Sequence, residues 1–295
     1  MTVNEWLFPR GSLARDGWES VVDGSLPGWQ HTGLRVAQLD GTIALPAAPV
    51  ERMVVPLAGS FTVTADAHRW TLAGRASVFD GPTDVLYLGV GTGARIEGEG
   101  RVAVAEAAAT AVLPAVHLPR RDVPVEIRGA GRSTRQVHNF GTPGALPAEK
   151  LIVCEVVTPA ENWSSYPPHK HDEATPGESR LEEIYYFEAA VSRGVAAPRS
   201  AAPFGLFAAY SSPAGEIDTD AVVTTGDIAL VPFGYHGPAA AAPGYDLYYL
   251  NVMAGPDPER AWRISDDPAH GWVRDTWLGQ RSDPRLPYLP KEHDA

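Results

Sequence analysis

The chain lacks the features that mark secreted and membrane-spanning proteins. It contains a single cysteine, Cys154, among 295 residues, so it can form no internal disulfide. No apolar run approaches the roughly 18 residues that a membrane-spanning helix needs. The N-terminus has neither a basic start nor an apolar signal core, so we expect no export, no membrane association and a cytoplasmic location.

Basic clusters are also missing. The formal net charge is -12 at pH 7, and the 24 lysines and arginines are scattered along the chain without forming a stripe. A surface of this sign repels phosphate backbones, so we expect no nucleic-acid partner. With 44% hydrophobic and 20% charged residues, the composition is that of a globular protein.

Helical periodicity is scarce, and 257–263 is predicted to form a short helix with Pro258 in its first turn. By contrast, 29 glycines and 27 prolines separate stretches rich in valine and tyrosine, a pattern typical of short strands joined by turns. The sequence therefore predicts an all-β fold with few short helices.

The expected strands fall into two groups, separated by an alanine- and proline-rich stretch at 106–124. This stretch predicts a boundary near 115–125 and two domains, 1–118 and 119–295. Weak similarity between the halves favours two copies of one antiparallel β-barrel. Strands are expected at 34–44, 52–65, 68–72, 76–79, 84–88, 94–97 and 101–106, and then at 124–128, 151–158, 183–188, 206–210, 220–224, 228–231 and 246–253.

The second half carries a pattern of metal-ligating residue types. His169 and His171 stand two residues apart after two prolines, so on an extended chain both imidazoles lie on one face. Glu183 opens an aromatic-rich strand, where a carboxylate is costly unless its charge has a partner, and its neighbour Glu182 competes for the role. His236 follows a turn, an apolar strand and a second turn. Three imidazoles and one carboxylate suit Mn, Fe, Co, Ni or Zn, so the sequence predicts one divalent metal ion here.

Two residues on neighbouring strands are candidates for catalysis. Glu155 stands in an apolar strand and is expected to face the interior, either as a general base or as the partner of an arginine. Tyr185 shares the parity of Glu183, so it is expected to point inward as a proton carrier.

Four further residues have open roles. Of Tyr248 and Tyr249 one must face inward, and because parity does not decide which, Tyr248 is a catalytic candidate and Tyr249 a substrate-binding candidate. Arg135 could clamp a substrate carboxylate, with a surface ion pair as the alternative. His138 could contact the substrate or be structural.

The order of these ligands resembles the cupin superfamily, which has a His-x-His pair, a later glutamate and, after a Gly, Pro, Gly pattern, a final histidine. Within it, the chain looks like the 5-deoxy-glucuronate isomerase family over nearly its whole length. The likeness is carried by the segments 164–172, 181–187, 234–236 and 248–255.

This resemblance implies two cupin-type barrels, of the double-stranded β-helix kind, with metal only in the second. It also implies an aldose-ketose isomerase that converts 5-deoxy-D-glucuronate, a small sugar acid, to 5-dehydro-2-deoxy-D-gluconate in myo-inositol catabolism, and homo-oligomers. By this hypothesis the metal stabilises a cis-enediolate while a base carries a proton between adjacent carbons. The alternatives are a metal-dependent cupin dioxygenase and a sugar-binding cupin without turnover.

Overall fold

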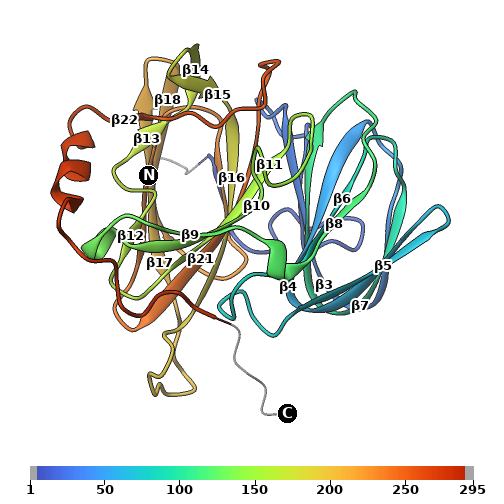
Figure 1. Cartoon of the computed structure of the whole chain (residues 1–295), viewed down its shortest axis with the longest axis horizontal. Coiled ribbons are helices and arrows are strands. Elements are labelled where there is room, and N and C mark those ends of the chain that lie inside the picture. Colours follow the sequence, from blue (N-terminus) through green and yellow to red (C-terminus); the bar gives the residue numbers. More distant parts are fainter. Residues whose placement is uncertain (1–4, 290–295) are drawn as a thin grey trace.

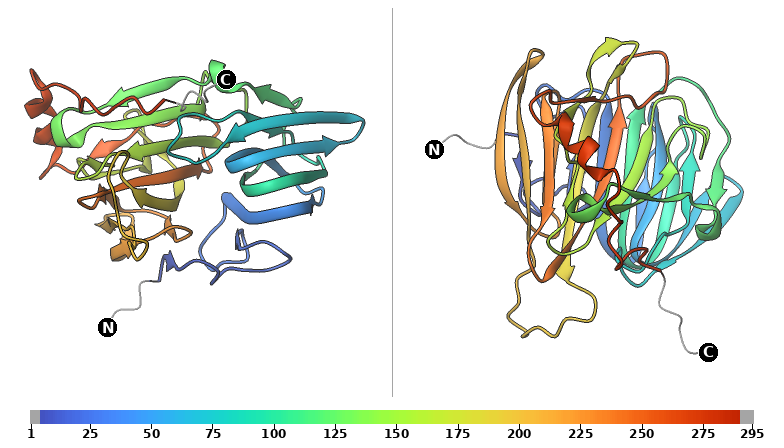
Figure 2. Two further views of the ribbon diagram at one scale, coloured as in Figure 1. Left: turned by 90° about the horizontal axis from the view of Figure 1, so that it is seen from below. Right: turned by 60° about the vertical axis from the view of Figure 1, so that its left-hand side comes forward.

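A computed structural model describes residues 5–289 of the chain. The fold is almost entirely β, as the sequence predicts, and its strands form two units that lie side by side. Figure 1 and the left view of Figure 2 show the blue-to-cyan strands of the first part on one side and the yellow-to-orange strands of the second part on the other.

The N-terminal unit is built on one seven-stranded antiparallel sheet. Its order is β2-β3-β7-β4-β6-β8, with β5 paired to β4. The strands expected at 94–97 and 101–106 form one continuous strand. The strand predicted at 76–79 is wrong, because this segment is a turn. Ser77 Oγ accepts a hydrogen bond from the Phe79 amide and closes the turn. The strands are β2 Ser20–Val22, β3 Thr32–Leu45, β4 Val50–Ala65, β5 His68–Arg75, β6 Val85–Leu88, β7 Ala94–Ala108 and β8 Val116–Leu118.

The C-terminal unit contains a second seven-stranded sheet, of order β1-β19-β16-β21-β11-β10-β9. Its first strand comes from the N-terminus of the chain and pairs with β19. The strands are β1 Leu7–Phe8, β9 Val125–Arg128, β10 Arg135–Gly141, β11 Ile152–Thr158, β16 Glu182–Val191, β19 Ile228–Val231 and β21 Tyr245–Ala254.

A six-stranded sheet packs against this one. Phe187 and Tyr249 of the first sheet and Phe207 and Ala239 of the second share one buried cluster, so the two sheets face each other across a core. The hydrogen-bonded sheets do not close into continuous barrels, which corrects the closed form that the sequence suggested. The second sheet contains β12 Trp163–Ser164, β13 His169–Lys170, β17 Gly205–Ser212, β18 Gly215–Val223, β20 Tyr235–Ala241 and β22 Ser265–Asp266, and a separate hairpin joins β14 Asp172–Thr175 to β15 Glu178–Arg180.

The helices that the structure describes between residues 5 and 289 are three short 3-10 turns, η1 Arg120–Asp122, η2 Gly131–Ser133 and η3 Gly271–Trp277. None is long and apolar enough to cross a membrane. The predicted helix at 257–263 is wrong, because the segment is irregular. Tertiary contacts override its local pattern: Arg260 donates to the carbonyls of Gly141, Leu146 and Leu151 at 2.6 to 2.8 Å.

The two units share a buried core. Met53 and Tyr87 of the N-terminal sheet belong to the same hydrophobic cluster as Val153 and Leu250 of the C-terminal sheet. The division of the chain at residue 118 stays a prediction from the sequence.

Candidate metal centre

Three strands from two sheets bring the predicted metal ligands together. His169 on β13 is the register partner of His236 on β20, and His171 follows β13 directly. Glu183 reaches the same place from β16 in the facing sheet. All four side chains are buried, with between 0% and 8% of their surface exposed.

The closest group is formed by His171, Glu183 and His236, whose ligand atoms all lie within 4.8 Å of one another. One carboxylate oxygen, Glu183 Oε2, lies 3.0 Å from His171 Nε2 and 3.1 Å from His236 Nε2. His169 does not belong to this closest group, but its ring centroid is 4.5 Å from that of His236. The four predicted ligands are therefore neighbours in space, and three of them converge.

The backbone orients the three imidazoles. The Nδ1 atoms of His169, His171 and His236 lie 3.3, 2.9 and 3.2 Å from the carbonyl oxygens of residues 167, 181 and 234. Because a carbonyl only accepts, each Nδ1 carries a proton, so Nε2 is the ring nitrogen that can present a lone pair to a metal. This is the arrangement in which outer contacts hold histidine ligands to a metal.

The charge state of the cluster follows from burial and close contact. Burial by itself raises the pKa of Glu183, but its contacts with His171 and His236 lower that pKa to about 2. Burial and the two neighbouring imidazoles lower the pKa of His169. For His171, the lowering by burial is outweighed by Glu183, which raises its pKa. The centre thus combines an ionised carboxylate with three imidazoles, an environment that favours a bound cation.

These residues fit a divalent metal. His236 Nε2 is buried and makes no hydrogen bond, although Glu183 lies near it, so a buried lone pair has no partner among the described residues. A lone pair facing a carboxylate oxygen is unfavourable unless a cation or proton lies between them. Imidazole nitrogens with a carboxylate oxygen are the donor set of Zn and of Mn, Fe, Co and Ni sites.

The residues next to the ligands are held away from the centre. Lys170 donates to Asp172 and Glu178 at 2.7 and 2.9 Å. Glu182, the competing candidate, accepts hydrogen bonds from the backbone amides of Thr32 and its two predecessors and stays outside the cluster. Glu183 is therefore the glutamate that meets the histidines.

A cavity of about 240 Å³ opens beside the centre. Such a volume holds about eight water molecules at roughly 30 Å³ each, which suits a small molecule. Its lining combines His169 and Glu183 with tyrosine, valine and arginine side chains. The remaining lining residues are Arg128, Arg135, Val137, Val156, Ser165, Tyr185, Tyr249, Asn251, Trp262, Ile264 and Arg274.

Arg135 is a buried cation in this cavity and, within the described part of the chain, it has no acidic partner. It is 9% exposed, and its Nη1 donates to the carbonyl of Ser133 at 3.0 Å. Burial lowers its pKa from 12.5 to about 10. The other two arginines of the cavity are paired, Arg128 with Glu126 and Arg274 with Asp266. An unpaired buried guanidinium is a ready site for a carboxylate.

Two tyrosines face the same cavity through one serine. Ser165 Oγ lies 3.1 Å from Tyr185 Oη and 3.2 Å from Tyr249 Oη. Burial raises the pKa of both phenols, well above the ordinary range for Tyr185 and to about 12 for Tyr249. Both are therefore protonated at neutral pH, and the serine links them into a chain of exchangeable protons.

Three other candidates lie on the face of the sheet opposite the cavity, which corrects the inward orientation that was expected of Glu155. Glu155 makes a bidentate ion pair with Arg75 at 2.6 and 2.7 Å and accepts a hydrogen bond from Tyr248 at 2.8 Å. His138 Nδ1 lies 2.5 Å from the same carboxylate. Their neighbour on β11, Val156, lines the cavity, so Glu155 must point away from it. Of the two roles expected for Glu155, general base or partner of an arginine, the structure shows the second.

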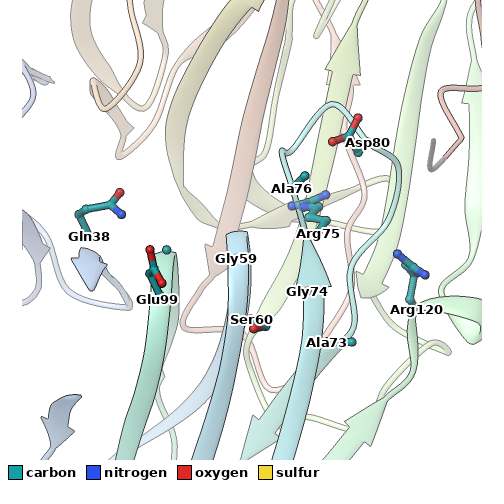
Figure 3. A pocket seen from close by; sticks show the side chains of 11 residues that line it. Gln38, Gly59, Ser60, Ala73, Gly74, Arg75, Ala76, Asp80, Glu99 and Arg120 are labelled. Atoms are coloured by element: carbon teal, nitrogen blue, oxygen red, sulfur yellow. The ribbon is translucent and has the colours of Figure 1, made fainter. Parts of the chain in front are cut away.

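A larger hollow, of about 940 Å³, lies on the N-terminal sheet and contains none of the predicted site residues. Figure 3 shows Gln38 and Glu99 at one end and Asp80 and Arg120 at the other. Arg75 lines it, but both of its terminal nitrogens are engaged by Glu155. The smaller cavity is the better candidate because its polar side chains converge.

Sequence reasoning missed several cavity residues. Asn251 is a polar residue at the inward parity of an apolar strand, a signal that could have been used. Ser165 precedes the two prolines of the histidine motif. Trp262, Ile264 and Arg274 come from irregular or 3-10 structure after β21, where no periodic signal exists.

Fold and site together define a cupin-type β protein with a candidate histidine and glutamate metal centre. Comparison of the chain with protein families matches the KduI/IolB family over residues 7–273. The chain belongs to that family.

Relatives and solved structures agree with this assignment. The 5-deoxy-glucuronate isomerase of Geobacillus kaustophilus is 40% identical over 282 residues, which cover 93% of this chain and 97% of the relative. That of Listeria monocytogenes is 33% identical and covers 92% and 96%. The crystal structure of an IolB-like protein from Salmonella typhimurium matches with a TM-score of 0.81 at 34% identity, over 91% and 98%. Oxalate decarboxylase of Lactobacillus farciminis, at 13% identity, covers 90% and 89% with a TM-score of 0.60 and shows the shared fold alone.

Proposed function

We propose that the protein is an aldose-ketose isomerase that converts 5-deoxy-D-glucuronate to 5-dehydro-2-deoxy-D-gluconate in myo-inositol catabolism. The observation that carries the proposal is one cavity lined both by two of the four predicted metal ligands, His169 and Glu183, and by the buried Arg135, which has no acidic partner among the described residues. An acid with an aldehyde at one end and a carboxylate at the other matches both. The names of the curated relatives point the same way.

In this proposal, His169, His171, Glu183 and His236 hold one divalent metal ion, taken from Mn, Fe, Co, Ni and Zn. When bound, the ion supplies positive charge that stabilises negative charge on the substrate oxygens during enolisation. The Nδ1 contacts of His171 and His236 with backbone carbonyls leave Nε2 as the ligating nitrogen, and the lowered pKa of Glu183 favours the ionised carboxylate that ligation requires.

The chain's own side chains would bind and protonate the substrate. Arg135 binds the carboxylate as a charge-assisted pair and so orients the aldehyde end toward the histidines. Tyr185 and Tyr249, linked by Ser165, hold protons at the cavity wall, and as protonated phenols they would donate to the substrate oxygens and take those protons back as negative charge moves from one oxygen to the other. Glu155, His138 and Tyr248 do not take part, because they lie behind the sheet.

The experiment is metal analysis combined with an isomerase assay on the wild type and on His171→Ala. We expect the wild type to carry about one equivalent of metal and to lose turnover on chelation, with recovery on adding the metal back. His171→Ala should lose both metal and activity. His68→Ala, which removes an exposed histidine on β5 of the N-terminal sheet, is the matched control. Full turnover after exhaustive chelation would refute the proposal, and oxygen consumption during turnover would favour a dioxygenase.

The cytoplasmic location and the homo-oligomer stay predictions from the sequence.

A further inference from the structure

Two valines separate the candidate metal centre from Arg135. Val137 and Val156 are register partners on β10 and β11, both line the cavity, and they are 1% and 5% exposed. Arg135 is two residues from Val137 on β10, so it projects from the same face of the sheet. On this side of the guanidinium the sheet therefore presents two apolar side chains to the cavity.

The pairing of the strands fixes the order in which side chains line the cavity, along a diagonal across the sheet. Glu183 on β16 pairs with Met253 on β21, and two residues along β21 Asn251 follows. The next inward position on β21 is Tyr249, which pairs with Val156 on β11. The order across the sheet is thus carboxylate ligand, Asn251, the valine pair and Arg135. A molecule held at the first and last of these must lie over the valines.

We propose that Val137 and Val156 form the wall for the substrate carbon next to the carboxylate, and so select a sugar acid that is deoxygenated there. This inference rests on the proposed function. In 5-deoxy-D-glucuronate, carbon 5 bears no hydroxyl and is bonded to the carboxylate carbon. With the carboxylate on Arg135, that methylene group meets the valine methyl groups. A hydroxyl that faced the valines from the same carbon would leave water for methyl groups, which offer it no hydrogen bond in return.

The polar groups of the cavity fall where this orientation places the remaining hydroxyls. Asn251 is 3% exposed and its Nδ2 has no hydrogen-bond partner among the described residues. It lies between the metal ligands and the valines, which is where the hydroxyls of carbons 3 and 4 fall. The unpaired amide donor of Asn251 favours a hydroxyl on carbon 3 or 4 of the substrate, while the valines favour a carbon 5 without a hydroxyl.

The test compares two open-chain inhibitors. One is the hexonate made by reducing the aldehyde of 5-deoxy-D-glucuronate, and the other is the hexonate made in the same way from D-glucuronate. They differ only in the hydroxyl next to the carboxylate end, and neither has an aldehyde with which to form a sugar ring. We expect the deoxy acid to inhibit the metal-loaded wild type about 10 to 100 times more strongly.

Val156→Thr keeps the shape of the side chain and adds a hydroxyl, so the ratio of inhibition constants should fall to about one to three. Val137→Thr is a second variant with the same expected result. Val223→Thr is the matched control, because Val223 is buried in the same core cluster but does not line the cavity, and its ratio should equal that of the wild type.

A ratio near one in the wild type, or an unchanged ratio in both cavity variants that still turn over 5-deoxy-D-glucuronate, would overturn the inference and leave the proposed function intact. Absence of wild-type turnover would instead refute the proposed function, and the inference with it.

Discussion

Arg135 offers a test in which stability and activity should move in opposite directions. Folding carries this guanidinium from water into a site where no carboxylate of the described residues pairs with it, and its pKa falls from 12.5 to about 10. At 1.36 kcal/mol per pKa unit, the charged form costs the folded state roughly 3 kcal/mol. Because the folded pKa is the lower one, this cost is present in full below pH 10 and is relieved only as the pH rises toward 12.5.

Replacing Arg135 with methionine should therefore stabilise the free protein. The variant removes the buried charge but loses the hydrogen bond to Ser133, which contributes about 1 kcal/mol. The net gain is about 2 kcal/mol, or a rise in Tm of roughly 3 °C for a chain of this size. Activity should fall, since a substrate carboxylate loses its charge-assisted partner, and kcat/KM should drop about 100-fold or more.

The assays are thermal unfolding in a buffer free of carboxylates and steady-state isomerase kinetics. Arg75→Met is the control, because that guanidinium is paired with Glu155 and its removal leaves a buried carboxylate uncompensated. We expect it to cost about 3 to 5 kcal/mol. If Arg135→Met lowered Tm as much as Arg75→Met does, or kept kcat/KM within threefold of the wild type, the reasoning about an unpaired anion-binding arginine would fail.

Two further predictions separate the two faces of the sheet. Burial raises the pKa of Glu155, but Arg75 and His138 lower it to about 2, so its ion pair stabilises the fold above pH 4.5 and this contribution is lost as the pH falls toward 2. Glu155→Gln should lower the free energy of unfolding in urea by about 3 kcal/mol at pH 7 and flatten its acid dependence; equal acid profiles for variant and wild type would contradict this. Tyr185→Phe should lower kcat about 10- to 100-fold with metal retained. Tyr248→Phe should change the free energy of unfolding by about 1 kcal/mol and leave kcat within threefold. Equal losses of kcat in the two variants would argue against placing Tyr185 in the active cavity and Tyr248 behind the sheet.

The local pattern of the sequence was enough to predict most strands and the group of metal-ligating side chains. Period-two alternation ties His169 to His171 and Tyr185 to Glu183, because residues two apart on a strand share a face. The scarcity of helical periodicity, together with valine- and tyrosine-rich stretches between glycines and prolines, predicted the all-β class, which the structure confirms. These are properties of a few neighbouring residues, so no tertiary information was needed.

Segments shaped by distant contacts could not be predicted in this way. The 257–263 segment has a helical pattern, but the three backbone carbonyls bound by Arg260 lie more than 100 residues upstream. Periodicity also shows which residues on one strand share a face without showing what that face meets. Glu155 and Tyr248 therefore could not be distinguished from cavity residues until the sheet was seen with Arg75 behind it.

The sequence by itself determined the fold class, the strand parities and the identity of the candidate ligands, since these follow from the chemistry and spacing of near neighbours. Only the tertiary structure decided which face of the sheet meets the cavity, that Arg135 has no counter-ion among the described residues while Arg75 has one, and that two valines lie between Arg135 and Glu183 in the sheet register. Those facts depend on how strands distant in the chain are paired, and pairing is set by the packing of the whole core.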